Sequence, residues 1–209
     1  MAIAYDNSSN TTPASTSSSF SFTTSGSNRI LIADLFLAAG TVSTITYNGV
    51  TMTLLDSDSS FATSYRYYLL NPATGANTFS VTSSGLPILE INLASYNGVA
   101  GGIGVNNKAT VTASSISNSL TTTVANSWVN GSIITNSSPQ TFTASGSGFI
   151  RLDGNGAAVI DTNSQISSPS SVTMGASYTF STQAVMYLLE LKSVANTANS
   201  SALLMMTPA

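Results

Sequence analysis

Cysteine and histidine are both absent from the sequence. Without cysteine the chain forms no disulfide and no thiolate metal site. Without histidine it lacks the commonest general base and the commonest transition-metal ligand. A serine nucleophile would therefore have no usual base, and no Ser-x-x-Lys motif with partners replaces it. We expect a protein that is not an enzyme and that needs no cofactor.

Charge is also scarce. Only 6% of the residues are charged, against about 25% in an average soluble domain. Serine and threonine take their place, at roughly a third of the chain, far above their usual share. Five basic residues cannot form the basic patch that nucleic-acid binding requires. Because near-neutral surfaces favour association, we expect a homo-oligomer.

Long apolar runs are missing, so no segment is expected to span a membrane. The N-terminus, which reads MAIAYD, has neither the basic nor the apolar region of a secretion signal. We therefore expect a protein that is made and folded in a cytoplasm.

Short runs rich in Val, Ile, Thr, Tyr and Phe alternate with Gly, Asn, Ser and Pro turns, which is typical of strands. Asn48-Gly49 is a strong signal for a hairpin turn, since both positions accept positive φ. No amphipathic helix is evident, so we predict an all-β protein: an antiparallel two-sheet sandwich, jelly-roll-like in topology. The expected strands are 15–23, 29–37, 43–47, 51–55, 63–70, 78–82, 87–95, 109–113, 119–124, 127–135, 148–152, 157–161, 171–178 and 183–192.

We expect a single sandwich domain over residues 1–195. The polar residues 6–13 are predicted to be a turn-like segment outside the sheets, and the glycine-rich residues 98–104 to be a loop. Residues 196–209 form a C-terminal tail with an apolar end, which we expect to dock on its own sandwich or on a neighbour. The residues expected to mediate assembly are Leu203, Leu204, Met205 and Met206.

Two groups of acidic residues suggest chemistry. Asp56 and Asp58 are the best carboxylate pair for a glycosidase, but their Asp-Ser-Asp-Ser-Ser context favours a solvated loop. Asp153, Asn155 and Asp161 partly resemble a calcium loop. They lack the later ligands of such a loop, and a hairpin turn is the favoured interpretation.

Glu90 and Glu190 stand within apolar strands. We expect each to face solvent on the period-two pattern, or to pair with Arg29 or Arg66.

Aromatic residues offer a candidate glycan platform. Tyr65 and Tyr67 share one strand face, and Trp128 is the only tryptophan. A sole tryptophan packs into a core more often than it lies on a surface. Glycan contact through Tyr65, Tyr67 and Trp128 is therefore the alternative to core packing.

Several segments resemble β-sandwich modules of bacteriophage structural proteins and bacterial surface proteins. The resemblance covers most of residues 15–192, and its motifs are turn and strand signatures. They are NRILI at 28–32, TYNGV at 46–50, YLLNPATG at 68–75, SYNGV at 95–99, TTTVANSW at 121–128 and the closing strand 184–191.

The resemblance implies a jelly-roll-like sandwich used for attachment, decoration or assembly, and it carries over no catalytic residues. A chain that starts at its own Met without a signal favours a virion component over a secreted module. We therefore expect a capsid decoration or cement protein, or a fibre or tail subunit, with other virion proteins as partners. The alternatives are a carbohydrate-binding or adhesin module at a cell surface and, last, a glycosidase.

Overall fold

The computed structural model of the chain describes residues 2–60 and 63–193. Within these ranges the backbone forms strands, turns and bends, and three sheets whose pairings are all antiparallel. The predicted all-β antiparallel sandwich is therefore confirmed. Among the same residues, no helix exists that could cross a membrane.

The N-terminal half contains two sheets, with strand orders β1-β9-β3-β7-β6 and β2-β8-β4-β5. The first sheet consists of β1 (Ala4–Thr11), β9 (Ile88–Asn97), β3 (Ile30–Leu37), β7 (Thr63–Leu70) and β6 (Thr53–Asp58). The second consists of β2 (Ser17–Thr24), β8 (Gly75–Gly85), β4 (Gly40–Tyr47) and β5 (Val50–Thr51).

Strand pairing in this half is nested. β1 pairs with β9, β2 with β8, β3 with β7 and β4 with β5. At the centre of the nest lies the predicted turn, where Asn48 and Gly49 have φ values of 49° and 75°, as a type I′ turn requires. Successive pairs belong to opposite sheets, so this half is one long hairpin wrapped into a jelly roll.

The C-terminal half is built from a single sheet with the order β10-β15-β11-β14-β13, and β12 also pairs with β15. Its strands are β10 (Gly102–Thr121), β15 (Ser171–Lys192), β11 (Trp128–Thr135), β14 (Ala157–Asp161), β13 (Phe149–Asp153) and β12 (Phe142–Gly146).

This sheet folds over itself and makes both layers of a second sandwich. β10 pairs with β15 along both strands, with a register shift between Ala113 and Ser115. On one side of that shift β15 also pairs with β11, and on the other side with β12. In its place in the fold, β10 thus corresponds to β1 and β2 joined end to end. β15 corresponds in the same way to β8 and β9. β11, β12, β13 and β14 take the places of β3, β4, β6 and β7. The chain therefore repeats its jelly-roll topology.

Each sandwich has its own core of alternating inward residues. Buried apolar side chains of the first core include Leu35 of β3, Ile91 of β9, Tyr47 of β4 and Phe79 of β8. Those of the second core include Ile133 of β11, Ile160 of β14 and Leu188 of β15.

The two sandwiches stack through a third apolar layer, which we call the seam. It lies between the sheet β1-β9-β3-β7-β6 and one layer of the second sandwich. That layer consists of β13, β14, β11, the part of β15 that pairs with β11, and the part of β10 beside it. Ile30 of β3 shares an apolar cluster with Trp128 of β11, and further along Phe36 shares one with Ile134. β3 and β11 therefore run side by side in the same direction.

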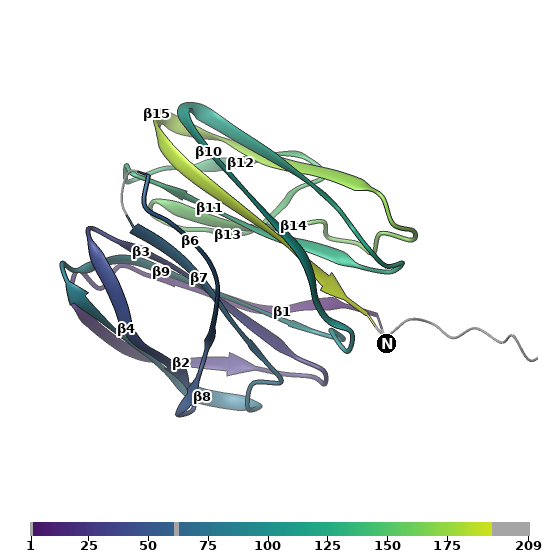
Figure 1. Cartoon of the computed structure of the whole chain (residues 1–209), viewed down its shortest axis with the longest axis horizontal. Coiled ribbons are helices and arrows are strands. Elements are labelled where there is room, and N and C mark those ends of the chain that lie inside the picture. Colours follow the sequence, from purple (N-terminus) through teal and green to yellow (C-terminus); the bar gives the residue numbers. More distant parts are fainter. Residues whose placement is uncertain (1, 61–62, 194–209) are drawn as a thin grey trace, which may run out of the picture.

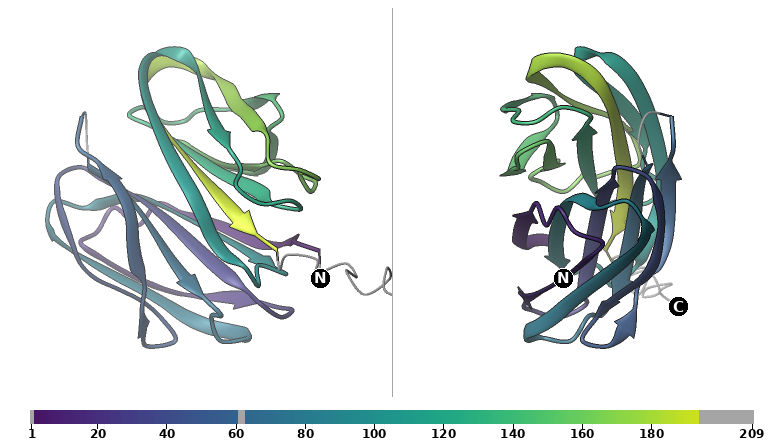
Figure 2. Two further views of the ribbon diagram at one scale, coloured as in Figure 1. Left: turned by 45° about the vertical axis from the view of Figure 1, so that its right-hand side comes forward. Right: turned by 90° about the vertical axis from the view of Figure 1, so that its left-hand side faces the viewer.

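Contacts across the seam pair the strands in reversed order. β1 meets β13, β9 meets β14, β7 meets β15 and β6 meets β10. β3 lies over β11 at the centre. An approximate two-fold axis, parallel to these two strands, therefore relates the two sandwiches. Figures 1 and 2 show the purple-to-blue half and the green-to-yellow half lying against each other.

Stacking buries the inner sheets on both faces. All eight residues of β3 and all eight of β11 are buried, which explains their near-continuous apolar sequence. A two-sheet protein would leave one face of each strand in water, so the seam changes the environment of every polar residue on that face.

Most expected strands are present, and those at 63–70 and 157–161 have the predicted bounds. The prediction for 6–13 was wrong: β1 runs through most of this segment and pairs with β9. Residues 98–104 include the start of β10, and the separate strands 109–113 and 119–124 are one strand. β12 was not predicted. The single domain expected over 1–195 stays a prediction, since the two sandwiches share the seam.

Candidate functional site

Buried polar residues gather at the seam, where they form two connected groups. The first joins Asp34, Arg66 and Asn130. Arg66 Nε lies 3.3 Å from Asp34 Oδ1, and both side chains are almost completely buried. Arg66 also donates a hydrogen bond from Nη2 to Asn130 Oδ1 on the other sandwich. A guanidinium so enclosed needs its counter-charge in place, so this group fixes the two sandwiches in register.

The second group continues from Asn130. Its Nδ2 donates to the Tyr96 hydroxyl at 2.9 Å, and the hydroxyl donates to Asp161 Oδ2 at 3.0 Å. Arg151 Nε completes the chain with a 2.7 Å ion pair to the same oxygen. Burial, and then the Asp161 charge, raise the pKa of Tyr96 well above its ordinary value. Tyr96 therefore stays protonated and serves as a hydrogen-bond link, not as an acid.

Arg151 closes one edge of the seam. Its guanidinium carbon lies 4.7 Å from the ring centre of Tyr5 and 4.6 Å from that of Phe149. It also lies 5.8 Å from that of Trp128. Rings at these distances attract the cation through their π faces. The arrangement is a cation cage already filled by the protein's own arginine.

Glu190 lies on β15, and its carboxylate is enclosed by the segment before β11. It accepts hydrogen bonds from the Thr123 N–H and from the Ser127 hydroxyl, both at 2.7 Å. Burial alone would raise the pKa of Glu190, but these donors outweigh it and the pKa is lowered. The group is an ionised structural acceptor.

Glu90 lies on β9 and is 4% exposed. Its Oε1 accepts from Asn10 Nδ2 at 2.6 Å, and its Oε2 accepts from the Gly156 N–H at 3.0 Å across the seam. A Cβ at position 156 would approach Oε2 to 2.9 Å, so a side chain at this position would displace the carboxylate. Burial raises the pKa of Glu90, even though Gly156 and Asn10 act in the opposite direction.

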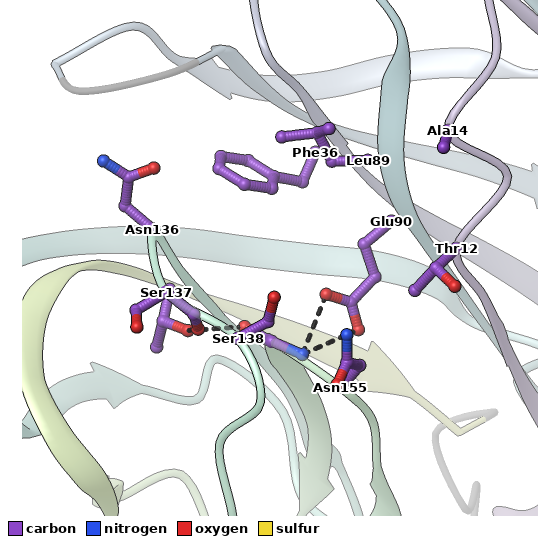
Figure 3. A pocket seen from close by; sticks show the side chains of 11 residues that line it. Thr12, Ala14, Phe36, Leu89, Glu90, Asn136, Ser137, Ser138 and Asn155 are labelled. Atoms are coloured by element: carbon purple, nitrogen blue, oxygen red, sulfur yellow. Dashed lines mark hydrogen bonds between the residues drawn. The ribbon is translucent and has the colours of Figure 1, made fainter.

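Glu90 also lines a cleft of about 330 Å³ where the seam reaches the surface. Figure 3 shows its carboxylate between Phe36 and Leu89 on one side and Ser138 and Asn155 on the other. The remaining lining residues are Thr12, Ala14, Thr135, Asn136, Ser137 and Gly156.

This cleft holds one carboxylate among its lining residues. Hydrolysis of a glycosidic bond uses two, one on each side of the bond. The cleft therefore does not contain the carboxylate pair that this reaction uses. The described residues also contain no group of three or more acidic side chains that could hold a metal ion.

The candidate calcium residues are not brought together. Asp153 is paired with Ala158 near one end of the β13–β14 hairpin, whereas Asp161 is paired with Phe149 at the other end. Asp161 is already bound by Arg151 and Tyr96.

The candidate glycan platform does not form either. Trp128 is 6% exposed and lies in the seam, and Tyr67 is 8% exposed and lies in the first core. Tyr65 packs against that core as well, and its hydroxyl donates to Gly40 O. Leu203, Leu204, Met205 and Met206 lie outside the described residues.

The expected settings of Glu90 and Glu190 were wrong. Neither faces solvent, and among the described residues neither is paired with an arginine. Arg29 instead donates to Pro72 O, and Arg66 is paired with Asp34. For Glu90 the seam supplies a second buried face, which the two-sheet expectation did not include. Glu190 faces the second sandwich, where Thr123 and Ser127 enclose it.

Asp56 and Asp58 share one partner. Lys108 of β10 lies 3.4 Å from Asp56 and 3.3 Å from Asp58. The two carboxylates thus close the edge of the seam where β6 meets β10, and they form an ion-pair group, not an open acidic pair.

Comparison of the sequence with protein-family models and with curated proteins finds no match. The class that the structure defines is an all-β protein of two stacked jelly-roll sandwiches.

Proposed function

We propose that the chain is a non-catalytic structural protein that works by assembly, as a virion component such as a capsid decoration or cement protein or a fibre or tail subunit. The observation that carries this proposal is the separation of charge from the outer faces. All five basic and all eight acidic residues of the sequence lie on or directly beside strands of the two inner layers.

The outer layers expose hydroxyl groups instead. On the first sandwich, rows of Ser and Thr cross neighbouring strands, as in Ser19, Ser80 and Thr46. On the second sandwich the equivalent strands carry Ser119 opposite Thr173, with hydroxyls 2.7 Å apart. Such faces are wet but uncharged, so copies can approach without electrostatic repulsion.

The approximate two-fold axis places one such face at each end of the molecule. A particle lattice needs a rigid unit with at least two attachment surfaces, and repeated weak contacts then add to high avidity. The buried polar groups of the seam support the same proposal, because they hold both ends in a fixed relation.

Sedimentation velocity over a range of protein concentrations tests the proposal. We expect reversible self-association that high salt leaves largely unchanged, since the charged residues lie on or beside the strands of the inner layers and not on the outer faces. Ser80→Glu and Thr173→Glu each place a charge in one outer face and should weaken association. Ser168→Glu, in an exposed loop outside the strands, is the matched control and should not.

Deleting residues 196–209 should weaken assembly further if the tail bridges subunits. Density-gradient fractionation of particles from cells that carry the gene should place the chain in the particle band. A wild-type protein that stays monomeric at all concentrations and is missing from that band would refute the proposal.

The glycan-binding alternative has lost its candidate platform, because Tyr67 and Trp128 are buried. A glycan array on the wild-type protein separates it from the assembly proposal, which expects no sugar-dependent signal.

A further inference from the structure

Four carboxylates are buried among the described residues, and they differ in how their charge is balanced. Asp34, Glu90 and Asp161 face the seam, whereas Glu190 faces the second sandwich. Asp34 and Asp161 each have an arginine partner. Glu190 has backbone and hydroxyl donors strong enough to lower its pKa.

Glu90 differs from the other three. Its donors are backbone N–H groups and an amide, and none of the described Lys or Arg side chains lies within ion-pair distance of it. Burial raises its pKa in spite of these donors. A buried carboxylate that lacks a cation gains most from one that is added.

Glu90 also lines an open cleft. The wall from the first sandwich is apolar and includes Ala14, Phe36 and Leu89, of which Leu89 is 38% exposed. The wall from the second sandwich is polar and includes Ser138 and Asn155, beside the carboxylate (Figure 3).

We propose that this cleft binds a primary ammonium group on a short alkyl chain, with the ammonium on the Glu90 carboxylate and the methylenes against Leu89 and Phe36. An ammonium has three donors and no acceptor. Glu90 takes one donor, and hydroxyl or amide oxygens of the polar wall accept the others. At about 330 Å³ the cleft is at the small end of ligand sites, which suits a single alkyl chain.

This chemistry has two sources: a free alkylamine, or the side chain of a lysine on a partner protein. The inference does not rest on the assembly proposal, because a free amine would occupy the same cleft on a monomer. Its failure would leave the outer faces and their test untouched.

Amide NMR of the ¹⁵N-labelled full chain provides the test, because the Gly156 N–H donates directly to Glu90. We expect n-pentylammonium to shift the Gly156 resonance with a Kd of about a millimolar, as a ligand with few heavy atoms would. 1-Pentanol, which has the same chain without the charge, should bind at least about tenfold more weakly. Nα-acetyl-lysine amide distinguishes the sources, since its binding shows that a lysine side chain also enters.

Two variants and a control complete the experiment. Glu90→Gln should weaken n-pentylammonium binding about tenfold or more. Leu89→Ser keeps the carboxylate but removes part of the apolar wall. It should weaken the binding of n-pentylammonium and leave the binding of the ammonium ion unchanged. This variant keeps the proposal testable if Glu90→Gln fails to fold. Asp153→Asn removes a charge from the same hairpin as Gly156 and should bind as the wild type does. The proposal is overturned if Gly156 does not respond, if 1-pentanol binds equally well, or if Glu90→Gln binds like the wild type.

Discussion

The Asp34–Arg66 pair allows a quantitative test of the seam. Arg66 is completely buried and Asp34 is 3% exposed. Asp34→Ala would leave the guanidinium with only the Asn130 oxygen as a described hydrogen-bond acceptor. Removing one partner of a buried ion pair costs about 3–5 kcal/mol, because the remaining charge stays desolvated. We expect Asp34→Ala to lower the free energy of unfolding by that amount.

Urea unfolding with linear extrapolation measures the effect. The double variant Asp34→Leu with Arg66→Met removes both charges and should recover most of the loss, since apolar replacements of buried pairs are often neutral. Lys108→Ala at the edge of the seam is the reference, and it should cost less than Asp34→Ala, because the side chains of Lys108 and Asp56 are 29% and 24% exposed. If Asp34→Ala costs no more than Lys108→Ala, or if the double variant is as unstable as the single one, the seam pair does not fix the sandwiches as argued.

The same structure supports four further predictions. Glu190 has a lowered folded-state pKa, so wild-type stability should fall as pH drops through that pKa, and Glu190→Gln should lose this dependence. Glu90 has a raised pKa, so the wild type should gain stability as pH drops from neutral through it, and Glu90→Gln should not. Gly175→Ala should destabilise by about 1–3 kcal/mol, because its Cβ would lie 2.4 Å from Ile116 O, whereas Ser177→Ala on the same face should be near neutral in chemical denaturation. Trp128, 6% exposed in the seam, should show blue-shifted fluorescence whose loss on unfolding coincides with the far-UV circular dichroism change; an earlier fluorescence change would mean that the sandwiches separate first.

The strands could be predicted because their residues alternate or form dense apolar runs. Residues 63–70 follow this pattern closely, and Asn48-Gly49 adopts the turn that its composition predicts. β1 was missed because its sequence, AYDNSSNT, carries only one large apolar side chain. It is an edge strand held by backbone pairing with β9 and by polar contacts, and neither leaves a periodic apolar signal.

The candidate site could not be predicted, because the seam has no signature of its own in the sequence. The apolar run of β3 showed a strand buried on both faces, but not what covers its second face. Glu90 in an apolar strand was expected to face solvent or pair with an arginine. Its actual partner is the Gly156 backbone on the other half of the chain. Gly156 lies at the tip of a hairpin, and the turn alone explains a glycine there. The sequence therefore contained no separate sign of its contact with Glu90.

The repeated topology is equally hidden in the residues, and it changes what the buried polar groups mean. At equivalent seam positions β3 has Ile32 and Asp34, whereas β11 has Asn130 and Ser132. Two identical halves related by a two-fold axis would face like with like, so the Asp34–Arg66 pair of one half would meet a second such pair instead of Asn130. Divergence lets the first half supply Arg66, and the second half supply Asn130 as its acceptor. The buried polar groups of the seam thus find their partners only when the first half packs against the second half. Packing of two first halves would leave Arg66 buried without Asn130. Specific pairing of the halves, more than added stability, is therefore what these buried charges contribute.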